Sequence, residues 1–186
     1  ASTFFITALA LIYAATGTVN MAELSQRIPE LSAGVRTGFS LLLILVFGIK
    51  AGLFPLFFWL PDSYPTAPGA ITAVFAGLLT KVGVYAIIRS QTLLFPPEAQ
   101  QGSFLLVLAG FTMVIGVLGA LAQDDRRRML SFHIVSHIGY MIFGLALFTL
   151  AGIAAAVFYV VHHIVVKTAL FLVAGLVERR AGSDRL

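Results

Sequence analysis

The chain contains no cysteine and very little charge, and each scarcity excludes a class of protein. Without a thiol there is no disulfide and no thiolate metal site, and the redox compartment stays open. Charged residues make up only 11% of the chain, whereas a soluble domain carries about 25%. Hydrophobic residues make up 59%, and the mean hydropathy is +0.98. The composition therefore indicates a polytopic membrane protein rather than a soluble domain or a nucleic-acid binder.

Apolar segments fill most of the chain. A membrane-spanning helix takes about 20 mostly apolar residues, and six segments are long enough: residues 3–20, 38–60, 70–89, 103–122, 129–148 and 151–178. We therefore expect an all-α fold, a polytopic membrane helix bundle of about six transmembrane helices in one membrane domain over residues 1–186. The chain begins without a methionine or a basic leader and ends just after a span, so we interpret it as an interior piece of a longer protein.

Arginines stand at or near the ends of these segments and indicate the orientation. If the helices alternate, one side holds six arginines: Arg126, Arg127, Arg128, Arg179, Arg180 and Arg185. The other side holds three: Arg27, Arg36 and Arg89. Cytoplasmic loops carry the excess of Lys and Arg. We therefore expect the six-arginine side, which includes the N-terminal side of the first helix, to be cytoplasmic.

All three lysines lie inside apolar segments, at Lys50, Lys81 and Lys167. Arginine stays protonated in proteins, whereas a buried lysine can give up its proton. An intramembrane cation costs about 2.5–3.5 kcal/mol on insertion scales and usually lies beside water or a partner. The carboxylates, however, all fall in loops or at segment ends: Glu23, Glu30, Asp62, Glu98, Asp124, Asp125, Glu178 and Asp184. We expect the partner acid of the lysines in helices outside this sequence.

The second segment contains a helix break next to its lysine. In Lys50-x-x-x-x-Pro55, the proline lacks an N–H, and its ring clashes with the carbonyl four residues back, at Ala51. We predict a helix broken near residues 51–55, and the residues that break it are Gly52, Pro55 and Pro61. Broken helices at the membrane midplane are recurrent ion sites in transporters, so Lys50 is a candidate for proton translocation. A plain proline kink, with Lys50 reaching toward the interface, is the alternative.

Histidines and a lysine repeat at helical spacing in the last two segments. His163 and Lys167 are four residues apart, and so are His133 and His137, so each pair shares a helix face. A proton can pass between such groups directly or through one water. We favour His137 and His163 as relay members, whereas His133 and His162 fit a relay or an ordinary packed histidine equally well.

Taken together, these residues resemble one family of membrane proteins. The motifs that carry the likeness are Lys50-x-x-x-Phe54-Pro55-x-x-x-Trp59-Leu60-Pro61-Asp62, Ala67-Pro68, Leu79-x-Lys81-x-x-x-Tyr85-x-x-x-Arg89, Gln123-x-Asp125-x-x-Arg128, Ser136-His137-x-Gly139-Tyr140 and His163-x-x-x-Lys167-x-x-Leu170-Phe171-Leu172. The chain resembles the proton-conducting, antiporter-like membrane subunits shared by respiratory complex I, membrane hydrogenases and multisubunit Mrp-type Na+/H+ antiporters. Within that family it is most similar to the Mrp D subunits. Complex I relatives often carry histidine where this chain has Phe57 and Tyr64.

The resemblance implies a fold of about 14 helices with two inverted repeats, each with a broken helix, of which this chain would be the sixth to the eleventh. It implies proton translocation along Lys50, Lys81, His137, His163 and Lys167. It also implies a glutamate beside Lys50, on the fifth helix of the family, which comes before this chain. The implied partners are other subunits of a hetero-oligomeric membrane complex, the lipid bilayer, and protons with Na+ as the exchanged cation. No nucleic acid, cofactor or metal is implied. The implied location is the inner membrane of a bacterial cell.

Three other interpretations stay open. The chain could be a proton-pumping membrane subunit of a complex I-like NADH:quinone oxidoreductase or of a membrane hydrogenase. A non-transporting structural subunit would tolerate neutral replacement of all three lysines, and Lys81 would then simply be bonded to backbone carbonyls. A b-type haem needs two histidines on opposite faces of one iron, which only His137 with His162 or His163 could supply.

Overall fold

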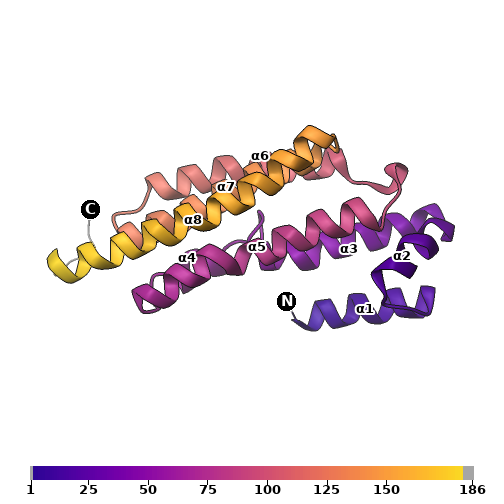
Figure 1. Cartoon of the computed structure of the whole chain (residues 1–186), viewed down its shortest axis with the longest axis horizontal. Helices are drawn as coiled ribbons and strands as arrows, with labels where there is room; N and C mark the ends of the chain where they lie inside the picture. Colours follow the sequence, from indigo (N-terminus) through magenta and orange to yellow (C-terminus); the bar gives the residue numbers. More distant parts are fainter. Residues whose placement is uncertain (1, 182–186) are drawn as a thin grey trace.

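The computed structural model describes residues 2–181, and its elements are helices joined by short connections (Figure 1). The α-helices are α1 (Ser2–Thr16), α2 (Met21–Arg27), α3 (Ala33–Ala51), α4 (Trp59–Ser63), α5 (Gly69–Leu93), α6 (Gly102–Leu121), α7 (Arg126–Ala146) and α8 (Leu150–Ala181). Single 3-10 turns lie at η1 (Ile28–Glu30) and η2 (Pro97–Ala99). The described residues contain no strand, so the predicted all-α fold class is confirmed.

Five helices of the described part, α3, α5, α6, α7 and α8, are long and apolar enough to cross a membrane. A sixth span results if α1 and the α2–η1 segment, which are bent by 55° at their junction, are taken together. This agrees with the expected bundle of about six transmembrane helices. α3 begins at residue 33 and α5 ends at residue 93, beyond the apolar segments of the sequence, because polar residues continue both helices.

The helices pack so that α5, α7 and α8 meet in the interior. Figure 1 shows α6 and α7 above α3 and α5, while α8 crosses obliquely from one end of the bundle to the other. α5 packs against both α3 and α8, and α7 packs against both α6 and α8. Fully buried side chains such as Ile87, Ile134 and Ile138 belong to the larger hydrophobic core. Polar side chains on the facing surfaces of α5, α7 and α8 are thereby held away from both ends of the bundle.

The chain reverses direction at the two ends of the bundle. One end holds α4, the connection from α6 to α7 and the last turns of α8 (Figure 1). The other end holds α2, the connection from α5 to α6 and the turn from α7 to α8. α1 begins near the middle of the bundle's length and runs toward this second end. The helices therefore alternate in direction, as a multi-span membrane bundle requires.

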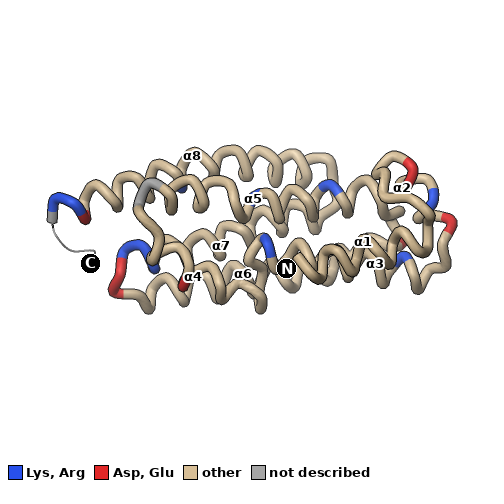
Figure 2. The backbone as a smooth tube through the Cα atoms, turned by 90° about the horizontal axis from the view of Figure 1, so that it is seen from below, with Lys and Arg blue, Asp and Glu red and all other residues tan. Residues whose placement is uncertain are grey.

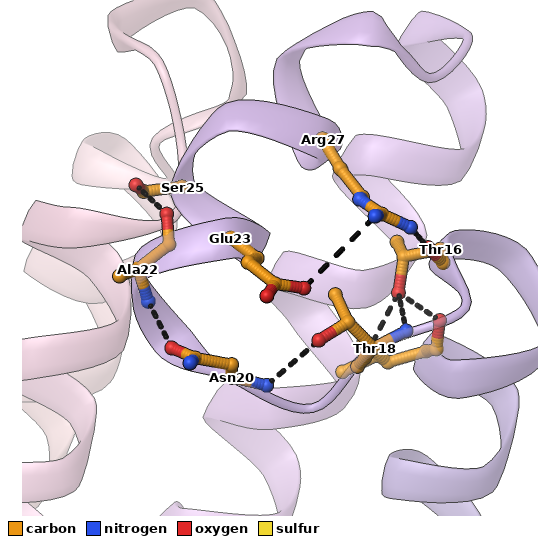
Figure 3. A network of polar contacts seen from close by, with 8 residues as sticks. Thr16, Thr18, Asn20, Ala22, Glu23, Ser25 and Arg27 are labelled. Atoms are coloured by element: carbon orange, nitrogen blue, oxygen red, sulfur yellow. Dashed lines mark hydrogen bonds and ion pairs between the residues drawn. The ribbon is translucent and has the colours of Figure 1, made fainter.

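The first helix ends at Thr16, earlier than the predicted residue 20, because Gly17 turns the chain in the left-handed conformation, with φ +73°. Asn20 then caps α2, and its side-chain oxygen accepts a backbone hydrogen bond at 2.9 Å. Arg27 closes this corner, since its guanidinium donates to the Thr16 carbonyl and lies 3.9 Å from the Glu23 carboxylate (Figure 3). Arg27 is therefore held in place by contacts with neighbouring residues of this turn.

The basic run of the sequence lies in a helix rather than in a loop. α7 begins at Arg126, before the predicted start at residue 129, because the Asp125 carboxylate caps it by accepting from the Arg128 backbone nitrogen at 2.7 Å. The Arg127 side chain forms an ion pair with Glu178 of α8. The first turn of α7 is thus bound to the last turns of α8.

A close helix contact at Gly83 holds α5 against the end of α3. A Cβ atom at this position would lie 2.5 Å from the Ala51 backbone nitrogen and 2.9 Å from its Cα, where no side chain can give way. We expect Gly83→Ala to lower the free energy of unfolding by about 1–3 kcal/mol. Gly110→Ala is the matched control on α6, because nothing lies within 4 Å of its added Cβ. Thermal unfolding of the full-length protein in detergent measures the stability of both variants. Equal unfolding midpoints for the two would contradict the predicted clash at Gly83.

Candidate functional site

The helix break follows Lys50 directly. α3 ends at Ala51, and Gly52 adopts the left-handed conformation with φ +82°, its N–H donating to the Gly48 carbonyl at 2.9 Å. Glycine takes this conformation without steric cost, so the helix ends at Ala51, four residues before Pro55. The expected clash of the proline ring with the Ala51 carbonyl therefore does not arise within a helix, and Gly52 ends α3.

The second half of the broken segment is α4. Pro61 lies inside α4, in its first turn, where the missing N–H of a proline removes no helical hydrogen bond. It therefore does not interrupt a helix. Pro55 lies in the connection between Ala51 and Trp59, outside both helices.

Side chains satisfy the backbone polar groups that the break exposes. Thr112 of α6 accepts from the Phe54 backbone nitrogen at 3.1 Å and donates to the Leu108 carbonyl at 2.6 Å. The indole of Trp59 donates to the Ile49 carbonyl at 2.8 Å, across the break. Non-helical backbone at membrane depth is tolerated only where protein or water supplies such partners. The break is thus a fixed feature that places Lys50 at the end of α3.

Lys50 itself is exposed in the chain described, and it does not reach the other two lysines. It lines a cavity of about 210 Å³ together with Ser2, Phe5, Val46, Phe47, Val82 and Ala86. No carboxylate of residues 2–181 lines this cavity. The expectation that all three lysines are buried is therefore not met for Lys50 within the described residues, because the start of α1 and two side chains of α5 border its cavity without covering it.

Lys81 is on a different face of α5 from the residues that line the cavity of Lys50. Its side chain is 3% exposed, and Nζ donates to the Ala76 carbonyl of its own helix at 2.5 Å. The next residue, Val82, lines the cavity of Lys50, so the two lysines face different neighbours. Lys81 is close enough to Lys167 of α8 for the two charges to interact. It belongs with the α8 side chains.

A chain of imidazoles and one ammonium group occupies the contact of α7 with α8. The His133 and His137 rings of α7 have centroids 4.4 Å apart, and the centroids of His137 and His163 of α8 are 4.8 Å apart. Lys167 is 1% exposed, and its Nζ lies 2.5 Å from Nδ1 of His133. His163 is 1% exposed, and neither ring nitrogen has a hydrogen-bond partner among the described residues. The four side chains therefore form a continuous polar cluster from the interior to the exposed ring of His133.

The structure adds two residues that sequence reasoning did not select. His133, left open between two roles, is the direct partner of Lys167. Tyr159 of α8 is the second, and its hydroxyl contacts Nδ1 of His137. Tyr159 is four residues before His163 and therefore on the same helix face, a spacing that could have identified it. His162, by contrast, is exposed, with its ring stacked on Phe158.

The described carboxylates all lie near the ends of the bundle, and acidic residues appear only there in Figure 2. Two of them pair across helices, since Arg127 contacts Glu178 and Arg128 lies 3.2 Å from Asp62. The described residues contain no group of three or more His, Asp or Glu that could hold a metal ion. What occupies the interior is lysine and histidine, the side chains that can both take up and release a proton near neutral pH when buried.

The described helices thus form a polytopic membrane bundle with a broken helix, and lysines and histidines lie buried between three of its helices. The transmembrane family described as NADH:quinone oxidoreductase/Mrp antiporter matches residues 1–186, and the chain belongs to this family.

Individual relatives agree with this assignment. The chain is 50% identical over its whole length to the D subunit of the Na(+)/H(+) antiporter of Alkalihalophilus pseudofirmus, of which it covers 38%. It is similar to a chain of the Mrp complex from Dietzia sp. DQ12-45-1b, with a TM-score of 0.92 and 41% identity, over 100% of this chain and 34% of that chain. A chain of respiratory complex I from Thermus thermophilus gives a TM-score of 0.87 and 27% identity, over 98% and 39%. The chain thus spans about two fifths of the length of such relatives.

Proposed function

We propose that this chain forms the middle helices of a proton-conducting subunit in a multisubunit cation/proton antiporter of a bacterial cell membrane. The proposed role is secondary ion transport, not catalysis, with protons exchanged for a cation such as Na+ and with other membrane subunits as partners. The 50% identity to a relative named as the D subunit of an Na(+)/H(+) antiporter, against 27% to the complex I chain, supports the antiporter branch over the quinone-coupled one.

The observation that carries this proposal is the convergence of titratable side chains from three helices in the interior. In the proposed relay, a proton passes along Lys81, His163, His137, His133 and Lys167. Buried polar atoms normally have a partner, and ordered water supplies it where protein does not. The ring nitrogens of His163 have no described protein partner. We infer that an ordered water is the partner of this ring.

Lys50 occupies a second, incomplete part of the proposed route. Its cavity has apolar walls and, among the described residues, no acid. Intramembrane cations usually lie beside a partner charge. We infer that a carboxylate on a helix outside this sequence completes the cavity, so that Lys50 passes its proton when that pair forms and separates. Val82 and Ala86 of α5 line this cavity, which supports a second route that borders the same helix as the first one.

The proposed orientation puts α4 and the last turns of α8 on the cytoplasmic side. The described arginines at that end are Arg126, Arg127, Arg128, Arg179 and Arg180. Those at the other end are Arg27, Arg36 and Arg89, and Arg185 lies outside the described residues. Since basic residues concentrate in the cytoplasm, the N-terminal end of the first span would face the cytoplasm.

Lys81 variants test the proposed function. In everted vesicles with the full-length chain and its partner subunits, Na+ should collapse a respiration-driven pH gradient. We expect Lys81→Gln and Lys81→Arg each to slow this response at least about tenfold, because neither side chain exchanges a proton as lysine does.

The matched control is Arg89→Gln, which removes an exposed cation from the same helix and should leave the rate unchanged. Assembly is verified on native gels. Normal exchange in both assembled Lys81 variants, or a wild-type complex that responds to no monovalent cation, would contradict the proposal.

A further inference from the structure

Tyr159 stands outside the proposed relay but contacts it directly. Its hydroxyl meets Nδ1 of His137, the histidine whose ring lies between those of His133 and His163. The two rings are nearly parallel, with centroids 5.7 Å apart and an interplanar angle of 12°. Tyr159 is partly buried against α7. This is the one described hydroxyl that reaches a histidine of the cluster.

We propose that Tyr159 is a positioning residue, whose hydroxyl oxygen accepts a hydrogen bond from Nδ1–H of His137, so that Nε2 is the nitrogen that takes up and releases the exchangeable proton. The inference rests on the proposed function, in which His137 passes protons between its neighbours. The inference goes further by explaining why Nε2 of His137, and not Nδ1, exchanges protons with the other members of the cluster.

The need for such a residue follows from the two nitrogens of imidazole. A neutral ring has one donor and one acceptor nitrogen, and which one carries the proton is decided by the hydrogen bond that the other makes. A ring without such a bond can carry the proton on either nitrogen and can turn about its side-chain torsions. For His137, with imidazoles on both sides, the wrong tautomer would present an N–H donor at Nε2, where the relay needs an acceptor for the incoming proton. The Tyr159 hydroxyl removes that ambiguity.

Several titratable or charged groups face His137 from the helices around it. They are His133 and Tyr140 on α7, Tyr159, His162, His163 and Lys167 on α8, and Lys81 on α5. Among the described residues none of these is a carboxylate, which is the usual group that fixes the tautomer of a histidine. The tyrosine hydroxyl takes that place here.

Tyr140 supplies a matched control. Its ring lies 6.0 Å from that of His137, about as near as the ring of Tyr159, but the contact is between rings only. It is 51% exposed. Tyr140→Phe therefore removes an equivalent hydroxyl from the same neighbourhood without removing a hydrogen bond to His137.

The test compares Tyr159→Phe with Tyr140→Phe in the full-length complex. We expect Tyr159→Phe to slow Na+-driven proton movement about three- to tenfold, the factor that one hydrogen bond is worth, and to shift the midpoint of its pH profile. Tyr140→Phe should change neither. In complex labelled with 15N-histidine, solid-state NMR should show one neutral ring of the wild-type protein with its proton on Nδ1, and a mixture of tautomers for that ring in Tyr159→Phe. His137→Gln assigns the signal.

Two outcomes would overturn the inference. One is an unchanged tautomer in Tyr159→Phe. The other is an equal effect of both phenylalanine variants on rate and pH profile. Either result leaves the proposed function standing as long as the Lys81 variants are inactive. Failure of the proposed function is recognised separately, by normal exchange in those lysine variants.

Discussion

Replacing Lys167 by alanine is expected to abolish proton-coupled cation transport by the full-length complex. Lys167 is 1% exposed, and its Nζ contacts Nδ1 of His133 on the neighbouring helix, so it joins the interior to the exposed ring. Removing it breaks the relay and leaves His133 without that partner. A positioned proton-transfer group contributes about a hundredfold or more, which would bring the rate below detection in a vesicle assay.

Lys167→Arg separates proton exchange from charge. Arginine keeps the positive charge but does not deprotonate in proteins, so this variant should be as inactive as Lys167→Ala while the complex assembles normally. His162→Ala is the control from the same helix, because that ring is exposed and stacks only on neighbouring aromatic rings. Substantial transport in Lys167→Arg would show that a fixed charge suffices at this position and would refute proton exchange by Lys167.

The sequence predicted the parts of the site that depend on one helix. The run of apolar residues predicted the spans, Gly52 and Pro55 predicted a break beside Lys50, and the four-residue spacing placed His163 and Lys167 on one face. Each of these follows from local backbone geometry, the helical period or the absence of an N–H.

The parts that depend on packing between helices were not predictable in the same way. Lys167 contacts His133 across the α7–α8 contact rather than His163 on its own helix, and no periodicity within α8 indicates a partner on α7. Similarly, apolar surroundings in sequence suggested a buried Lys50. The side chain is exposed because burial depends on whether another helix covers that side of α3. The Asp125 cap also moved the start of α7 into what composition alone marks as a loop.

The three lysines therefore belong to two groups that border different faces of α5. Lys81 and Lys167 belong to one cluster, and each has a polar partner in this chain, the Ala76 carbonyl and His133, respectively. Lys50 lines a separate cavity at the helix break, with Val82 of α5 in its wall. Coupling between the groups would have to pass through or along α5. The tight contact of Gly83 with Ala51 holds α5 against the end of α3, next to Lys50 and two residues after Lys81.

Lys50→Ala is expected to abolish coupled transport in the full-length complex while leaving its assembly intact. The side chain makes no described ion pair and is exposed, so its loss leaves no buried partner unsatisfied within residues 2–181. Thermal unfolding should accordingly change little, in contrast to Gly83→Ala. Transport should fall about a hundredfold or more, because the proposed acid would lose the group with which it exchanges a proton.

Two control variants show whether the effect of Lys50 comes from its exchangeable proton, from its charge alone, or from any cation on α3. Lys50→Arg keeps the charge without an exchangeable proton and should be inactive. Arg36→Gln removes the other cation of α3, at the helix's first turns, and should be active.

If Lys50→Ala exchanged Na+ for protons at the wild-type rate, the cavity at the break would not lie on the proton route. The cluster of Lys81 and Lys167 alone would then have to conduct the protons. Loss of activity in both Lys50 and Lys167 variants, with stability preserved in Lys50→Ala, is the pattern that two proton sites in series across α5 require.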